Sequence, residues 1–332
     1  MSKKNLMANS GVPLHVNYKE DLTAKRNSAV DSWYVVCNFE FEGMQAGFEW
    51  HQMEVRIGEA RLTNTEFLLM DGTQKIWCDN SQTGLVSESH ASSDKELNVF
   101  SEFGALRGDC EKMSLKLESQ RGKVDVVLRP RGDVLYNGAT GLLRILGTGS
   151  YQYSFPNMDA EGTVTIDGKE YIVSSATAWF DRQWTFDSKT EGLIEKDKDK
   201  AKLTWLWLGM TLNADASGAI SLWDTYNNNC RNAFATILNK NGTQINAVAD
   251  ITYDNIWTSS RTGSRYPGKI HISIPTEELD ITLTALLDEP EFVHNEGVTF
   301  GCQSLCSVMG SYKGDSINRH VIVEIIGNLL GE

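Results

Sequence analysis

The chain has 332 residues, of which 41% are hydrophobic and 23% are charged, so it can form a sizeable core without disulfides or structural metals. Its length corresponds to about two domains. The formal net charge is −13 and no useful Lys/Arg-rich run occurs, which disfavours nucleic acid and anionic membrane surfaces as partners, because both are bound through positive charge.

The N-terminal stretch MSKKNLMANSGVPLHV contains two lysines but no apolar run of the kind found in signal peptides. No run of about eighteen apolar residues occurs anywhere, so we expect a cytoplasmic protein without membrane insertion. The six cysteines lack the paired spacing of a zinc site, which favours free and mostly buried thiols. The six histidines also lack metal-ligand spacing, and we expect neither a metal ion nor a cofactor.

Residues 32–55, SWYVVCNFEFEGMQAGFEWHQMEV, predict two aromatic-rich strands joined by a turn. Trp50 and His51 are adjacent in the second strand, so they point to opposite faces. His51 could therefore face a ligand cavity, although a structural histidine is the more ordinary interpretation.

Alternating apolar and polar residues dominate the rest of the chain. KMSLKLES and VDVVLRP form a predicted hairpin within residues 112–130, and residues 162–180 form a second one with Asp167-Gly168 as its turn. KIHISIP and DITLTALL repeat the pattern within residues 269–287. Helical periodicity is confined to short stretches, so the sequence predicts an all-β protein with many antiparallel strands.

Residues 203–227, LTWLWLGMTLNADASGAISLWDTYN, repeat the aromatic strand–turn–strand pattern of residues 32–55. Each copy is followed by a hairpin, which indicates two related β-domains. Trp205 and Trp207 share one face of their strand, while Leu206 and Leu208 share the other. A strand that is apolar on both faces is either central in a packed core or lines a cavity in a barrel.

Common catalytic signatures are missing, which leaves polar groups within aromatic strands as candidates. Leu222, Asp224 and Tyr226 share a face, so desolvation should raise the pKa of the Asp224 carboxyl, as a proton donor requires. We expect Asp224 to donate a proton with help from Tyr226, in a cavity walled by Trp205, Trp207 and Trp223 or by their neighbours. A buried salt bridge or a strand-end turn is the structural alternative.

The segment ATAWFDRQW places Asp181 and Arg182 between Trp179 and Trp184. Neighbouring residues on a regular strand point to opposite faces, so each charged group needs its own partner. We expect the pair mainly to hold the junction of the two domains, with the two tryptophans packed beside it. A direct catalytic role is the alternative.

The stretch GATGLLRILGTGSYQYSFPNMDAEGTVTIDGKEYIVSSATAWFDRQW, together with SWYVV, WLWLGMTL, SLWDTYN and SRYPGKIHISIP, resembles the lipocalin-like carotenoid hydratase family. This family is also called hydroxyneurosporene synthase-like or AttH/CrtC-like. The resemblance extends over nearly the whole chain. It weakens at the C-terminus, where the family's closing aromatic residues are absent although Glu296, Gly297, Glu324 and Gly327 remain, and Thr185 replaces a usual glycine.

The resemblance implies two consecutive lipocalin-like antiparallel barrels, residues 1–175 and 176–332, with a ligand cavity at or near their junction. It also implies a lyase or isomerase without a cofactor, a hydratase or intramolecular cyclase acting on a lipophilic polyene, prenylated or polyphenolic molecule. A non-catalytic carrier of a hydrophobic ligand is the alternative, and a homodimer is left open. The residues expected to bind the substrate are Trp33, Tyr34, Trp50, His51, Tyr153, Trp179, Trp184, Trp205, Trp207 and Trp223.

Overall fold

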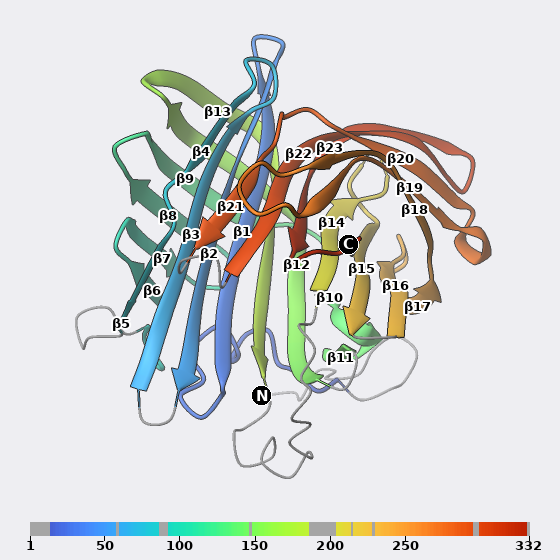
Figure 1. Ribbon diagram of the computed structural model, residues 1–332. Helices are drawn as coiled ribbons and strands as arrows, with labels where there is room; N and C mark the ends of the chain where they lie inside the picture. Colours follow the sequence, from blue (N-terminus) through green and yellow to red (C-terminus); the bar gives the residue numbers. More distant parts are fainter. Residues whose placement is uncertain are drawn as a thin grey trace.

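The computed structural model describes residues 14–57, 60–85, 92–145, 148–185, 204–213, 215–227, 230–294 and 299–330. Antiparallel strands make up most of these residues, with two short 3-10 helices, η1 (Asn137–Ala139) and η2 (Pro275–Glu277), among them. The strands form two curved sheets that lie against each other (Figure 1). The predicted all-β class with two lipocalin-like barrels is confirmed.

The first sheet has the strand order β4-β3-β2-β1-β13-β12-β9-β8-β7-β6, with β5 beside β3 and with β10 and β11 beside β12. Its strands are β1 (Val30–Phe41), β2 (Met44–Ile57), β3 (Ala60–Asp71), β4 (Ile76–Asp79), β5 (Gln82–Leu85), β6 (Leu97–Ser101), β7 (Gly104–Gly108), β8 (Met113–Glu118), β9 (Gly122–Pro130), β10 (Leu135–Tyr136), β11 (Leu142–Ile145), β12 (Thr148–Ile166) and β13 (Lys169–Thr185).

The second sheet has the order β17-β16-β15-β14-β23-β22-β20-β19-β18, with β21 beside β22. Its strands are β14 (Thr204–Thr211), β15 (Ala219–Asn227), β16 (Cys230–Leu238), β17 (Gln244–Val248), β18 (Asp250–Thr258), β19 (Arg265–Ile274), β20 (Leu279–Ala285), β21 (Glu291–His294), β22 (Thr299–Tyr312) and β23 (Asp315–Ile326). In both sheets the first strand of the half pairs with the last, β1 with β13 and β14 with β23.

The predicted hairpins are present as β8–β9, β12–β13 and β19–β20. Asp167 and Gly168 have positive φ values of 46° and 83°, the backbone that a tight hairpin turn requires. The predicted boundary between residues 175 and 176 falls inside β13, which continues to Thr185 and pairs with β1 as far as Trp184. The chain passes from the first sheet to the second between Thr185 and Thr204.

Strand parity divides the buried side chains into three layers. Trp33 and Val35 of β1 face the core enclosed by the first sheet, and Leu206 and Leu208 of β14 face the core enclosed by the second. Tyr34 lies on the opposite face of β1 and packs in a third layer with residues of both sheets. The strands that are apolar on both faces are therefore those that contribute to two layers.

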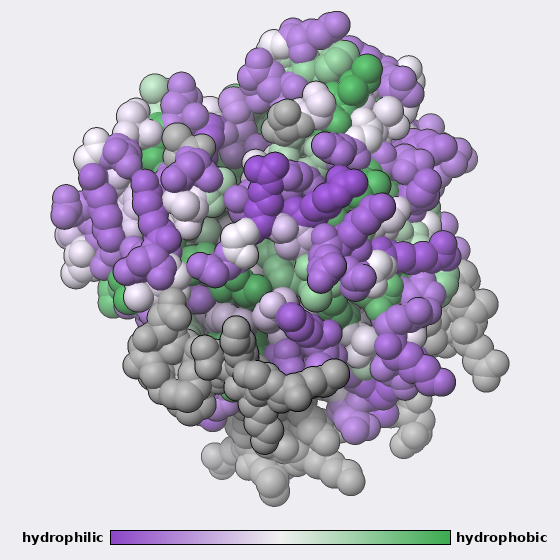
Figure 2. Space-filling model, turned by 180° about the vertical axis from the view of Figure 1, so that it is seen from behind, coloured by the Kyte–Doolittle hydropathy of each residue, from purple (hydrophilic) through white to green (hydrophobic). Residues whose placement is uncertain are grey.

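The third layer lies where the sheets meet. In Figure 1, β21 and the beginning of β22 cross in front of β2 and β3, and His294 at the end of β21 lies 3.3 Å from the Asp79 carboxylate at the end of β4. The face seen in Figure 2 is largely hydrophilic, with hydrophobic residues showing mainly between polar ones. No helix among the described residues is long and apolar enough to cross a membrane.

Candidate functional site

Aromatic rings from both sheets form the centre of the third layer. The Trp207 ring of β14 lies 5.2 Å from the Tyr34 ring of β1 and 6.0 Å from the Trp179 ring of β13, both nearly edge to face. Trp223 of β15 adds a ring 6.3 Å from Trp207, and His51 of β2 packs 5.1 Å from Tyr34. The junction of the two barrels is thus an aromatic layer, and five of the tryptophan and tyrosine residues expected to bind substrate lie in it, since Trp205 also packs there.

Acidic and amide side chains are buried among these rings. We call them the inter-barrel polar cluster, which consists of Tyr34, Glu49, His51, Glu66, Gln152, Ser154, Asp181, Gln303 and Glu324. Five buried polar atoms of this layer have no hydrogen-bond or ion-pair partner among the described residues: Tyr34 Oη, Glu49 Oε2, Gln152 Oε1, Trp223 Nε1 and Gln303 Oε1. Glu66 Oε2 makes no hydrogen bond but lies 3.8 Å from His51 Nδ1. Buried polar groups are normally paired, so this concentration of unpaired atoms indicates a place for a polar ligand or water.

Glu49 is the most strongly perturbed carboxyl of the polar cluster. It lies fully buried on β2, opposite Val36 of β1, and one carboxyl oxygen accepts a hydrogen bond of 3.1 Å from Gln303 Nε2 of the second sheet. Burial raises the pKa of Glu49 well above its usual range, and the neighbouring carboxylates of Glu66 and Glu324 raise it further. This shift favours the protonated form of Glu49, in which the carboxyl can donate a proton.

The Tyr34 hydroxyl lies close enough to Glu49 to counteract part of that pKa shift, yet neither it nor Glu49 Oε2 has a hydrogen-bond partner within bonding distance among the described residues. Burial, followed by the negative charge of the surrounding carboxylates, raises the pKa of Tyr34 well above 10. The phenol consequently stays neutral and can act as a hydrogen-bond donor beside the Glu49 carboxyl.

Asp181 occupies the opposite side of Tyr34, its cross-strand neighbour on β13. Its carboxylate accepts hydrogen bonds from Trp179 Nε1 at 2.6 Å, from Gln152 Nε2 at 3.1 Å and from the Ser154 hydroxyl. Burial raises the pKa of Asp181 to about 7 despite these three donors. The group can therefore gain or lose a proton near neutral pH, which suits a general base.

His51 and Glu324 complete the electrostatics of the polar cluster. Burial opposes the imidazolium form of His51, but the carboxylates of Glu66, Glu324 and Asp181 outweigh it and raise the pKa of His51. Burial also raises the pKa of Glu324, which accepts hydrogen bonds from Trp205 Nε1 at 2.5 Å and from Gln303 Nε2 at 3.1 Å. The Gln303 amide thus bonds both Glu49 of the first barrel and Glu324 of the second.

Asp224 does not belong to this cluster. It points into the core of the second sheet with Leu206 and Leu222, on the opposite face of β15 from Trp223. Arg231 binds its two oxygens through Nε and Nη2 at 2.9 and 2.8 Å, and the Tyr253 hydroxyl adds a bond of 2.5 Å. The expectation that Asp224 shares a cavity with Trp205, Trp207 and Trp223 is wrong, because the parity of β15 separates them.

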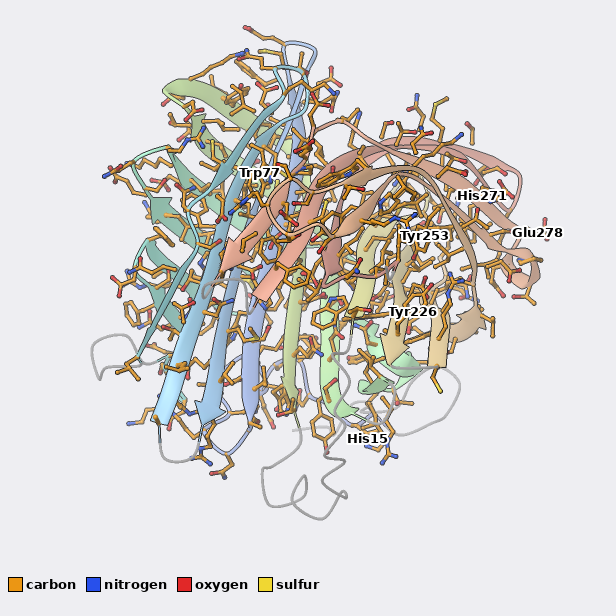
Figure 3. All side chains as sticks on the ribbon, viewed as in Figure 1. His15, Trp77, Tyr226, Tyr253, His271 and Glu278 are labelled. Atoms are coloured by element: carbon orange, nitrogen blue, oxygen red, sulfur yellow. The ribbon has the colours of Figure 1, made fainter. Side chains whose placement is uncertain are left out.

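Tyr226 lies beside the ion pair that Asp224 forms with Arg231. The Arg231 guanidinium lies 5.3 Å from the centre of the Tyr226 ring and 6.0 Å from that of Tyr253, and both rings lie in the second half of the molecule (Figure 3). This bidentate ion pair fits the structural alternative, a buried salt bridge, better than a proton donor.

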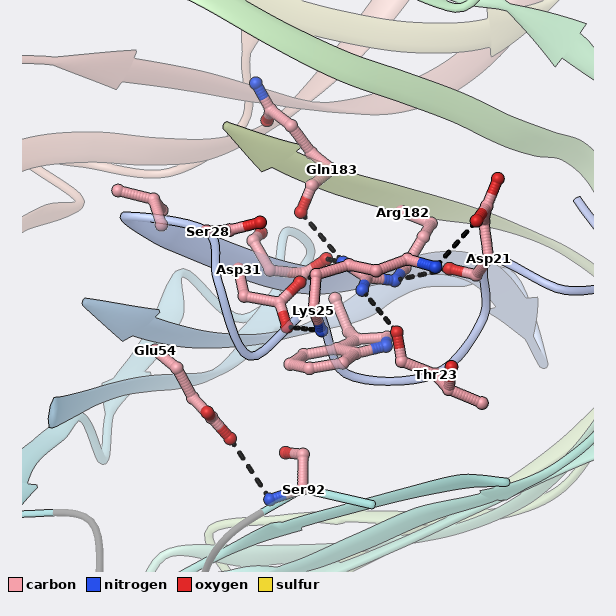
Figure 4. Close-up of polar contacts among 12 residues, drawn as sticks. Asp21, Thr23, Lys25, Ser28, Asp31, Glu54, Ser92, Arg182 and Gln183 are labelled. Atoms are coloured by element: carbon pink, nitrogen blue, oxygen red, sulfur yellow. Dashed lines mark hydrogen bonds and ion pairs between the residues drawn. The ribbon is translucent and has the colours of Figure 1, made fainter. Parts of the chain in front are cut away.

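Arg182 is buried on the other face of β13 from Asp181. Figure 4 shows the contacts of its guanidinium with residues of the first barrel. Its guanidinium lies 2.6 Å from Asp31 and donates to the backbone carbonyls of residues 21, 23, 32 and 183 at 2.7 to 3.0 Å. The Trp33 ring lies 4.3 Å from it and the Trp184 ring 5.0 Å. The prediction of separate partners for the two charges is confirmed, but Arg182 fastens residues 21–23 to the first barrel and does not reach the junction.

The other residues expected to bind substrate also divide between layers. Trp33, Trp50, Tyr153 and Trp184 belong to the core of the first barrel, where Trp33 Nε1 donates to the Leu22 carbonyl at 2.8 Å and Tyr153 Oη donates to that of Tyr18 at 3.2 Å. Tyr34, Trp179, Trp205, Trp207 and Trp223 lie at the junction, beside His51. The structure thus brings together six of the ten residues.

Sequence reasoning missed Glu49, Glu66 and Gln303. Glu49 alternates with Phe48 and Trp50 in a strand that has a second acidic residue, Glu54, so nothing in the sequence distinguishes it. Glu324 carried a weak signal, since it is the single charged residue of the apolar run VIVEIIG. The cluster forms only when β2 and β22 meet across the junction, where Gln303 bonds both Glu49 and Glu324.

No group of three or more metal-ligating side chains occurs among the residues that the structure describes. All six cysteines are free, and four of them are buried, as the sequence predicts.

The family model described as AttH-like matches residues 12–315. An AttH candidate from Nitrosomonas europaea has a similar structure, with 17% identity, a TM-score of 0.78 and coverage of 94% of this chain and 97% of the other. Kievitone hydratase from Nectria haematococca shares 15% identity, with a TM-score of 0.74 and coverage of 96% and 95%.

CghA, solved with Sch210972, shares 10% identity with a TM-score of 0.58 and coverage of 90% and 88%. Because all three sequence identities are low, these similarities establish a shared fold. No curated protein sequence matches the chain. Since the family model covers most of its length, the chain belongs to the AttH-like family.

Proposed function

We propose that the protein is a hydratase or intramolecular cyclase that acts on a lipophilic small molecule without a redox cofactor, and that Glu49 is its proton donor. The observation that carries this proposal is the pair of unpaired, buried polar atoms, Tyr34 Oη and Glu49 Oε2, beside an aromatic layer. The folds of kievitone hydratase and of CghA support the same class of enzyme.

In this mechanism the protonated Glu49 gives its proton to one carbon of an alkene. The electron pair of the double bond forms the new C–H bond, and positive charge develops on the second carbon. The faces of Trp207 and Trp179 can stabilise such a cation, and the layer excludes bulk water that would quench it. Tyr34 can orient the polar end of the substrate through its free hydroxyl.

The second half of the reaction needs a base. In a hydration, water attacks the cationic carbon and Asp181, whose pKa of about 7 allows it to be ionised, accepts the proton that the water loses. In a cyclisation, an internal double bond attacks in place of water and a neighbouring C–H proton goes to the base. Both outcomes use the same acid and the same cation-stabilising rings.

The test is incubation of the purified protein with a panel of polyene, prenylated and polyphenolic compounds in heavy water, without added cofactor. We expect one compound to be converted and its product to carry deuterium at carbon. Glu49→Gln should lower the rate by about 10²–10⁴-fold, the usual contribution of a general acid, while thermal stability is retained. A ligand that binds tightly and is recovered unchanged across the panel would instead establish a carrier.

A further inference from the structure

A second feature of the junction is lined in part by Trp179 and does not include Asp181. It is a groove of about 120 Å³ between the two sheets, to which β1, β12, β13, β14 and β23 contribute. Its lining includes Asn38, Trp179, Gly209, Arg319, His320 and Ile322. We call it the Arg319 groove.

Arg319 is a cation to which no residue of the described ranges supplies an anionic partner. Its Nη1 donates to the carbonyl and the hydroxyl oxygens of Thr211 at 2.6 and 2.5 Å, while its Nε is buried without a partner. Among the described residues no carboxylate lies within ion-pairing distance, and burial alone lowers the pKa of Arg319. Burying a charge is costly unless it is paired. The chain has a net charge of −13, so acidic side chains that could have paired with Arg319 are plentiful in the sequence.

Further donors line the same groove. Burial lowers the pKa of His320, which is therefore neutral at pH 7 and can donate one ring N–H. The nearest carboxylate that acts on His320 is Glu40, which is exposed and is held by Gln45 Nε2 at 2.8 Å. Asn38 adds a side-chain amide. A guanidinium, an imidazole and an amide that bond no carboxylate in the described part of the chain form a set suited to a carboxylate ligand.

The floor of the groove is apolar and closely packed. A methyl group at Gly209 would lie 2.5 Å from Trp179 Cε2, so the β14 backbone rests directly on the indole ring. Met210 and Ile322 continue this apolar surface. A ligand that contacts both the polar donors and the apolar floor of the groove therefore combines a carboxylate with a small aromatic or aliphatic body.

We propose that the Arg319 groove binds a small lipophilic carboxylate, with its anionic group on Arg319 and its apolar body against Trp179. The site is distinct from the inter-barrel polar cluster and does not depend on the function proposed above. The carboxylate can belong to the substrate itself or to a separate ligand, and the two sources give different kinetics.

The test uses trans-cinnamate and its uncharged analogue cinnamamide, titrated into the full-length protein by calorimetry. We expect cinnamate to bind about 10–100-fold more tightly than cinnamamide, because a charge-assisted hydrogen bond replaces a neutral one. Arg319→Gln should abolish this preference, whereas Arg129→Gln, which changes an exposed ion pair with Glu161 on the first sheet, should preserve it.

Equal affinity for acid and amide in the wild-type protein would overturn the proposal, and this comparison needs no variant to fold. A preference that survives in Arg319→Gln would overturn it as well. Glu49→Gln should leave cinnamate affinity unchanged, which separates this site from the proposed acid. In turnover assays, competitive inhibition by cinnamate assigns the groove to the substrate's own carboxylate, and non-competitive inhibition assigns it to a separate ligand.

Discussion

Replacement of Arg182 by methionine removes a buried cation while keeping much of its volume. Asp31, which is fully buried, would lose a partner at 2.6 Å and keep the Lys25 backbone N–H at the same distance. The carbonyls of Asp21 and Thr23 would lose their guanidinium donors. Breaking a buried pair by removing one partner typically costs about 3–5 kcal/mol, which for a domain of this size corresponds to a Tm lower by about 6–20 °C.

A double variant separates the charge effect from the packing effect. Asp31→Asn combined with Arg182→Met leaves no uncompensated charge, so it should be about 1–3 kcal/mol more stable than Arg182→Met alone. Arg129→Met is the matched control, because its ion pair with Glu161 is exposed and should contribute less than about 1 kcal/mol.

The assays are thermal and urea unfolding followed by tryptophan fluorescence, together with limited trypsin digestion. Lys25 and Arg26 follow the segment that Arg182 fastens, so cleavage there should accelerate in Arg182→Met and not in the control. Arg182→Met would refute this reasoning if its free energy of unfolding lay within about 1 kcal/mol of the wild-type value. A double variant as unstable as Arg182→Met would refute it as well.

Three further predictions concern the junction and the second barrel. Gly209→Ala should cost about 1–3 kcal/mol in urea unfolding, since its methyl group meets the Trp179 ring at 2.5 Å; wild-type stability would count against that close contact. Asp224→Asn should keep more than about a tenth of the turnover rate but lose thermal stability, because Asp224 pairs with Arg231; a hundredfold slower reaction would restore Asp224 as a candidate acid. For Asp181, with a folded pKa of about 7, the native state holds the proton more tightly than the unfolded chain between about pH 4 and pH 7. Asp181 stabilises the folded state below that window, and this stabilisation is lost as the pH rises through it, by at most about 4 kcal/mol. The free energy of unfolding of Asp181→Asn should therefore rise relative to that of the wild-type protein between about pH 4 and pH 7. A difference between the two proteins that stays constant over this range would contradict the assignment.

Strand parity made part of the site predictable. Because the chain alternates regularly in ATAWFDRQW, the separation of Asp181 from Arg182 follows from the sequence and is confirmed by their partners. The same rule applied to β15 already separates Asp224 from Trp223, so the expectation that they share one cavity conflicted with the pattern on which it was based.

Partnerships across the sheets could not be predicted in this way. The Asp224–Arg231 pair depends on the register of β15 with β16, where Arg231 stands opposite Tyr226. The contact of Glu49 with Gln303 depends on how two sheets pack, which a single sequence does not encode in any local pattern. Parity therefore identifies the face of each strand, whereas the identity of the facing residue requires the tertiary structure.

Infrared difference spectroscopy tests the central claim, that Glu49 is a buried and protonated acid at the barrel junction, without any substrate. The wild-type protein at about pH 8, above the titration of Asp181, should show the C=O stretching band of a protonated carboxyl group, with a small shift in heavy water. Glu324→Gln serves as the control, because Glu324 is a further buried carboxyl of the cluster whose pKa is raised. The account predicts that Glu49→Gln removes a band that Glu324→Gln retains; a spectrum unchanged by Glu49→Gln would contradict it.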